Sequence, residues 1–238
     1  MHKTTVFFLL LWSVPALAGP FTVSSPDSTA SKKIKLTGDL KDGPTKRSLT
    51  LPKVELATPV TSRLDLAIEV PYKTIERDHA DTESGIGDVE IKSKWNFFRS
   101  GPMALAVEPE LSLPTGDADR GLGNDDAGIK LPLILGYSTE SWEFGSELGY
   151  EHVFHQHEDS GYWGFLALRS VTSTLKVGAE IVAESADAKL RQIDTLANVG
   201  LKWKLAERFE LQALVGRTLH SQDGDIIRQY KLELEKKF

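Results

Sequence analysis

The chain has no cysteine, so neither disulfide bonds nor a lipid on an amino-terminal cysteine can stabilise or anchor it. After residue 18, no segment approaches the roughly 18 consecutive apolar residues that a membrane-spanning helix needs. Helical periodicity is nearly absent. A basic patch is also lacking, because acidic residues outnumber basic residues 34 to 28, which argues against nucleic acid as a partner. If the chain lies in a membrane, it must do so as a β-barrel.

The amino-terminal residues predict export. Residues 1–3 carry a charge, residues 6–12 form a short apolar run, and residues 16–18 are Ala-Leu-Ala. This order is typical of a secretory signal peptide that is cleaved before Gly19. We therefore expect a signal peptide at residues 1–18, a polar amino-terminal leader at residues 19–31, and one domain at residues 32–238.

That domain has the rhythm of β-strands. In the last segment Tyr230, Leu232 and Leu234 alternate with charged residues, which gives a strand one apolar face and one polar face. We predict about twelve such strands from the whole sequence. They are residues 32–40, 48–59, 63–75, 88–98, 103–114, 127–137, 142–155, 161–171, 175–185, 191–205, 209–219 and 226–238.

The connections between these segments alternate between tight turns and longer polar loops. The longer loops are residues 41–47, 76–87, 115–126, 156–160, 186–190 and 220–225. Short turns at one end and longer loops at the other are typical of outer-membrane barrels. The fold class that we predict is therefore all-β, a single transmembrane antiparallel up-and-down β-barrel in the outer membrane of a Gram-negative cell. An even strand count places both chain ends on the short-turn side.

Aromatic residues support a membrane barrel, because they gather near the predicted strand ends and leave the strand centres to aliphatic residues. Amphipathic rings prefer the level of the lipid headgroups. A soluble β-sandwich or a lipocalin-like barrel would instead collect its aromatic residues in a core. The residues that we assign to the two membrane interfaces are Trp95, Trp142, Trp203, Tyr150, Tyr162 and Phe238.

If the apolar side chains face lipid, their strand neighbours face an enclosed lumen, and these neighbours are mostly ionic. The predicted lumenal residues are Glu69, Glu90, Lys92, Lys94, Glu108, Glu110, Lys130, Glu143, Glu147, Arg169, Glu180 and Lys202. A barrel of this size holds either a narrow wet channel or a plug of ion pairs. A wall of both signs would pass small polar or zwitterionic solutes, with a weak preference for cations because carboxylates outnumber bases.

Two loop segments carry candidate chemistry. His155 and His157 share a face on an extended strand and could serve an outer-membrane hydrolase or lipid-modifying enzyme at the barrel rim. Residues 114–126 are rich in carboxylates and glycines, which suggests calcium, but they lack the spacing and the closing Glu of a calcium loop. A solvated loop is the simpler interpretation. We predict no catalytic residues, no metal site and no cofactor.

Three motifs resemble the outer-membrane transporter family named after the meta-pathway of phenol degradation. The match covers roughly residues 61–137. The motifs are the strand of residues 61–72 that ends in Pro71-Tyr72, the strand entry Gly85-Ile86-Gly87-Asp88, and Leu113-Pro114-Thr115-Gly116-Asp117 followed by Gly121-Leu122-Gly123.

The resemblance implies an outer-membrane β-barrel that admits small organic, including aromatic, compounds. We accordingly expect passive uptake of a small-molecule solute, contact with outer-membrane lipid and lipopolysaccharide, and recognition by the barrel-assembly machinery through the C-terminal strand. Lys236 departs from the usual barrel ending, because it takes a lipid-side position that is commonly apolar. A structural barrel whose interior is fully plugged by ion pairs is the alternative outside transport and catalysis.

Overall fold

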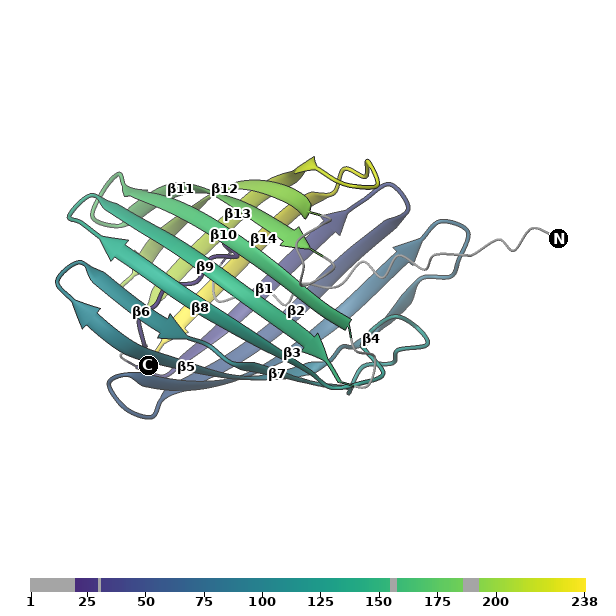
Figure 1. Cartoon of the computed structure of the whole chain (residues 1–238), viewed down its shortest axis with the longest axis horizontal. Helices are drawn as coiled ribbons and strands as arrows, with labels where there is room; N and C mark the ends of the chain where they lie inside the picture. Colours follow the sequence, from purple (N-terminus) through teal and green to yellow (C-terminus); the bar gives the residue numbers. More distant parts are fainter. Residues whose placement is uncertain (1–19, 30, 155–157, 186–192) are drawn as a thin grey trace.

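The computed structural model describes residues 20–29, 31–154, 158–185 and 193–238. Its regular elements are β-strands that form one barrel (Figure 1). Within the described ranges, no helix is long and apolar enough to cross a membrane. The strands are β1 (Lys33–Asp42), β2 (Lys46–Pro59), β3 (Leu64–Arg77), β4 (Glu83–Ile86), β5 (Val89–Ser100), β6 (Met103–Val107), β7 (Glu110–Leu113), β8 (Gly128–Ser138), β9 (Trp142–Val153), β10 (Glu158–Ser170), β11 (Leu175–Ser185), β12 (Ile193–Ala206), β13 (Phe209–His220) and β14 (Arg228–Lys237).

The sheet closes on itself. Neighbouring strands pair antiparallel around the ring, and β1 pairs with β14 from Lys33 opposite Lys237 to Asp42 opposite Arg228. Strands β4 and β5 both pair with β3, so together they take one place in the ring. Strands β6 and β7 both pair with β5 on one side and β8 on the other, so together they take the next place. The prediction of a twelve-stranded antiparallel barrel is therefore confirmed, with two of the strands interrupted.

The interruption between β6 and β7 has a local cause. Pro109 separates β6 from β7, and proline has no backbone N–H to give to a ladder. The Pro109 carbonyl still accepts a hydrogen bond of 3.0 Å from Ser93 N, so the wall stays closed there. The other break, at residues 87–88, separates β5 from β4. The prediction that residues 76–87 form a loop is wrong for residues 83–86, because Ile86 pairs with Tyr72 of β3.

The two faces of the wall differ as the period of two requires. In β14, Lys231, Glu233 and Glu235 face inward and are nearly buried, while Leu232 is 55% exposed on the outside. An outer surface of exposed leucine, valine and isoleucine continues around the barrel. This is the reverse of a soluble protein, whose large apolar side chains turn inward.

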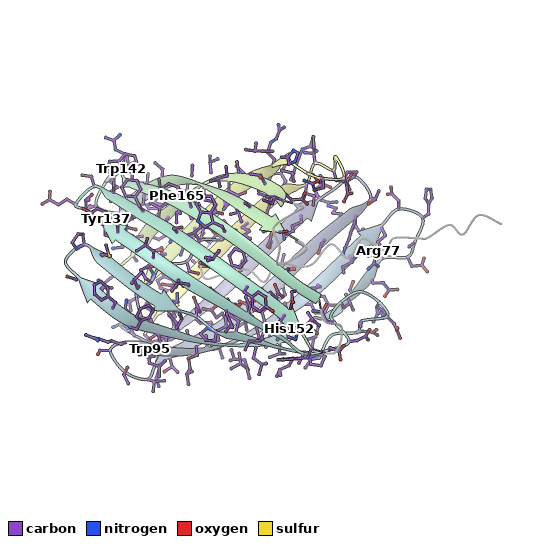
Figure 2. The ribbon with its side chains drawn as sticks, viewed as in Figure 1. Arg77, Trp95, Tyr137, Trp142, His152 and Phe165 are labelled. Atoms are coloured by element: carbon purple, nitrogen blue, oxygen red, sulfur yellow. The ribbon has the colours of Figure 1, made fainter. Side chains whose placement is uncertain are left out.

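Short turns gather at one end of the barrel, together with the start of β1 and the end of β14 (Figure 1). Trp95 and Trp142 lie near this short-turn end and are exposed on the outer face (Figure 2). Trp203 is also exposed. Lys236 also points outward, with its Nζ atom 4.9 Å from the ring centre of Phe238 and 5.6 Å from that of Phe209. The ammonium group thus rests on aromatic rings at the barrel edge.

The predicted orientation of β10 was wrong. Tyr162, expected at a membrane interface, is 6% exposed and points inward, and Arg169, expected in the lumen, is exposed outside and lies over the ring of Trp142. Both errors have one cause: Leu166 and Leu168 face the lumen, against the rule that leucines face lipid. Their neighbours in the lumen, described next, explain this exception.

Candidate channel lumen

The inner face of the barrel carries an unusual density of buried charge. Eleven carboxylates and six lysines among the described residues are buried. The carboxylates are Asp39, Glu55, Asp65, Glu69, Asp88, Glu108, Glu110, Glu147, Glu180, Glu233 and Glu235, and the lysines are Lys35, Lys53, Lys92, Lys94, Lys130 and Lys231. Charges are rarely buried unless they are paired, so the partners of each group decide how the lumen is organised.

On the wall formed by β1, β2, β3 and β5, and at Glu108 just after β6, these charges form ion pairs. Lys92 is the centre of the largest group, because its Nζ atom lies 3.0 Å from both Glu69 and Glu90. The other pairs are Lys35–Glu55 at 2.8 Å, Lys53–Glu69 at 3.3 Å and Lys94–Glu108 at 3.0 Å. This wall is therefore polar but largely neutralised.

On the opposite wall, the leader itself occupies the lumen. Phe21 and Val23 are 1% and 2% exposed, and they pack with Leu166, Leu168 and Leu214 in an apolar cluster inside the barrel. This cluster explains why two leucines of β10 face inward. The alternation of residues along the strands does not reveal this cluster.

The backbone of the leader is bound by two buried carboxylates. Thr22 N and Val23 N donate to Glu180 at 2.9 and 3.1 Å, and Ser24 N donates to Glu147 at 2.7 Å. Hydrogen bonds to charged groups are among the stronger ones in proteins. Backbone N–H groups of the leader thus take the role at Glu180 and Glu147 that lysines have at the carboxylates of the other wall.

Further along the leader, the bonding is reversed and the wall donates. Lys94 Nζ donates to the carbonyl of Ser25 at 3.0 Å, and Asn96 Nδ2 donates to the carbonyl of Pro26 at 2.9 Å. At the short-turn end, Arg99 pairs with Asp27, and Thr29 N donates to Asp65 at 2.5 Å. The leader therefore enters from the short-turn end and is bound along its length.

Glycines on the inner wall make room for the leader. A Cβ atom at Gly164 would lie 2.5 Å from Val23 Cγ2, and one at Gly200 would lie 2.9 Å from Phe21 Cζ. Gly145 and Gly136 meet Val23 and Pro26 in the same way, at 2.9 and 2.6 Å. Because β8, β9, β10 and β12 each contribute a glycine, they form a groove that fits the leader closely.

The described residues line at least two cavities in the lumen. One, of about 400 Å³, opens at the short-turn end and is lined by Arg99, Lys176, Lys202 and Lys204 together with leader residues. The other, of about 70 Å³, lies toward the long loops and is lined mainly by carboxylates and lysines. We call the second cavity the outer chamber.

The loop of residues 114–127 is attached to the wall beside this chamber. Asp88 accepts hydrogen bonds from Gly116 N at 2.9 Å and from Asn124 N at 2.8 Å. Thr115 Oγ1 donates to the Gly87 carbonyl at 3.0 Å, and Leu122 is 1% exposed. The loop is not the freely solvated segment that we expected. Within the described ranges, no group of His, Cys, Asp or Glu is arranged to hold a metal ion.

The structure places the remaining predicted residues as follows. On the inner face lie Glu69, Glu90, Lys92, Lys94, Glu108, Glu110, Lys130, Glu143, Glu147, Glu180 and Lys202, and exposed on the outer face lie Trp95, Trp142, Trp203, Tyr150 and Phe238. The predicted signal peptide at residues 1–18 and the predicted rim pair of His155 and His157 lie outside the described residues. Sequence reasoning missed Asn96, Tyr162 and the leader, because residue type alone does not identify a segment that is bound in a lumen.

Solved structures share this fold. The COG4313 outer membrane channel from Pseudomonas putida F1 is 14% identical, with a TM-score of 0.71 over 91% of this chain and 97% of that one. The NanC porin is 9% identical, with a TM-score of 0.63 over 86% of this chain and all of that one. The CymD monoaromatic hydrocarbon channel is 6% identical, with a TM-score of 0.51 over 89% of each chain.

At the level of sequence, none of the curated proteins matches the chain. A family model does match, under the description "Putative MetA-pathway of phenol degradation", and it covers residues 52–232. The match includes all three motifs from which the resemblance was inferred and extends well beyond them. The chain belongs to this family.

Proposed function

We propose that this protein is an outer-membrane channel for the passive uptake of small solutes, and that its leader, residues 20–29, acts as a plug. In this proposal the short-turn end faces the periplasm and the long loops face outward. The eleven predicted lumenal residues that lie on the inner face, from Glu69 to Lys202, contact the solute. The outer face contacts outer-membrane lipid and lipopolysaccharide, and the C-terminal strand is recognised by the barrel-assembly machinery.

One observation carries the proposal: a closed barrel with a lipid-compatible exterior encloses a charged interior, and a segment that precedes β1 lies in this interior, where hydrogen bonds and apolar contacts hold it. A purely structural barrel could fill its interior with side chains of its own wall. Instead, Glu147 and Glu180 are held by a short peptide that can leave through the short-turn end. The relatives with this fold include channels and porins, and we infer a transport role without catalysis.

Planar-bilayer conductance tests the proposal. The chain lacking residues 20–29 should conduct several times more current than the complete mature chain, because the groove beside β8–β12 becomes water-filled. A Phe21→Ala/Val23→Ala variant should fall between the two. Leu56→Ala, which shortens an apolar side chain at a half-exposed outer position, is the control and should leave the conductance unchanged.

A plugged structural barrel is the second candidate, because the ion pairs around Lys92 and the bound leader both fill the lumen. It predicts that the chain without residues 20–29 folds yet conducts no more than the complete chain. Heat-modifiable electrophoretic mobility would establish folding independently of current. A folded, non-conducting, leaderless barrel would therefore rule out the channel in favour of the structural role.

A further inference from the structure

The outer chamber contains two buried charged groups, Glu110 and Lys130, that form no hydrogen bonds with the described residues. Glu110 is 3% exposed, and among the described residues neither of its carboxylate oxygens has a hydrogen-bond partner. Lys130 is also 3% exposed, and its Nζ atom likewise has none in the described part of the chain. Both side chains line the same chamber.

These two residues lie directly opposite each other, Glu110 in β7 and Lys130 in β8. No hydrogen bond joins them in the described structure. Glu110 forms a long ion pair with Lys92, at 3.9 Å, and Lys130 lies 4.6 Å from the ring centre of Tyr162. By contrast, Glu147 and Glu180 accept several hydrogen bonds from the leader and from neighbouring side chains.

A buried charge without hydrogen bonds is unfavourable, and a bound group of opposite charge relieves that cost. The carboxylate of Glu110 would accept hydrogen bonds from an ammonium group, and the ammonium group of Lys130 would donate to an acceptor such as a carboxylate. A molecule that carries both groups would satisfy both residues at once. The remaining lining residues are also of both signs, including Lys53, Glu90 and Glu151.

The size of the chamber limits the ligand. Its volume of about 70 Å³ has room for roughly five waters, at about 10–15 Å³ for each. The ligand therefore has about five or six non-hydrogen atoms, which is the size of the smallest amino acids. An aromatic ring with polar substituents would not fit without movement of the wall.

The chamber is also more acidic than basic. Its carboxylates are Asp39, Glu69, Asp88, Glu90, Glu110 and Glu151, and its bases are Lys53, Lys73 and Lys130. An ammonium group is therefore held more strongly than a carboxylate. A simple cation should bind better than a simple anion, and a zwitterion should bind better than either.

We propose that the outer chamber is a binding site for a small zwitterion, whose ammonium group is held by Glu110 and whose carboxylate is held by Lys130. This inference rests on the proposed function, since it names the class of solute that would pause in the channel. It makes the chamber a selectivity site on the long-loop side of the leader.

Equilibrium dialysis of the complete mature chain in detergent, with radiolabelled free glycine as the probe, tests this site. Binding should be saturable and at least tenfold tighter than binding of methylammonium or acetate. Glu110→Gln and Lys130→Met should each weaken glycine binding at least tenfold, and Lys130→Arg should restore most of it. Glu233→Gln is the matched control, because Glu233 is buried but bonds to Thr37 and Gln212 outside the chamber.

Heat-modifiable mobility would show that each variant is folded before binding is compared. Equal binding of glycine and methylammonium would overturn the proposal in favour of a simple cation site. Unchanged glycine binding in folded Glu110→Gln, or no glycine binding to the unaltered protein, would overturn it as well. Because conductance is measured separately, a chamber that fails to bind glycine in a barrel that conducts would refute this site without refuting the channel.

Discussion

Single residues decide where the leader can bind. The inner wall of a barrel normally carries side chains that fill or line the lumen, but four glycines leave a path where Phe21, Val23 and Pro26 lie. The same contact reverses the expected orientation of β10. Alternating residues show that a strand has two faces. They do not show which face points into the lumen when, as in β10, leucines pack against a bound segment.

Gly164→Ala should loosen the leader. Its new Cβ atom would lie 2.5 Å from Val23, so either the leader or the wall must move. Overpacking of this kind costs about 1–3 kcal/mol, which corresponds to a roughly 5- to 150-fold lower occupancy of the groove by the leader. Single-channel recordings should show a matching increase in open time. In Gly128→Ala the new Cβ would meet ordinary contacts of 3.5 Å or more, so this control should behave like the unaltered chain, and equal behaviour of both variants would contradict the prediction.

At the scale of elements, the three sequence motifs form one structural unit. Gly87 N donates to the Pro71 carbonyl at 2.9 Å, Asp88 binds the backbone of residues 116 and 124, and Leu122 is buried beside Gly85. The sequence indicated a strand end, a strand entry and a loop, but not their contact, because hydrogen bonds between segments about 30 residues apart leave no periodic signal. The motifs therefore describe how one long loop is attached to the wall.

Asp88→Ala should release this loop. The substitution removes both hydrogen bonds to the loop backbone, each worth about 1.5–3 kcal/mol because the acceptor is charged, and trypsin should then cleave after Arg120 at least tenfold faster. Arg120 is held by Glu83 in the intact loop. Mass spectrometry of timed digests would measure the rate. Asp81→Ala, an exposed position in another long loop, is the control, and equal cleavage rates in the two variants would show that Asp88 does not hold the loop.

At the scale of the whole molecule, the sequence predicted the architecture well and the state of the lumen poorly. Twelve strand positions, antiparallel closure and an ionic interior all follow from a period of two, tight turns at one end and the charged inner residues. The leader could not be predicted, because its polar composition is that of any exposed segment. Its position depends on Glu147, Glu180 and the inner glycines, which become neighbours only when the barrel closes.

The charge of the interior predicts ion selectivity for the leaderless channel. Eleven buried carboxylates face six lysines in the described lumen, and removal of residues 20–29 takes away the backbone donors that bind Glu147 and Glu180. The negative potential should then favour cations. Reversal potentials in a potassium chloride gradient should give a potassium-to-chloride permeability ratio above one, which falls as salt screens the wall. Glu147→Gln/Glu180→Gln in the leaderless chain should lower the ratio. Clear anion selectivity would contradict the prediction, because it would mean that the lysine-lined cavity at the short-turn end controls permeation instead of the carboxylate-rich interior.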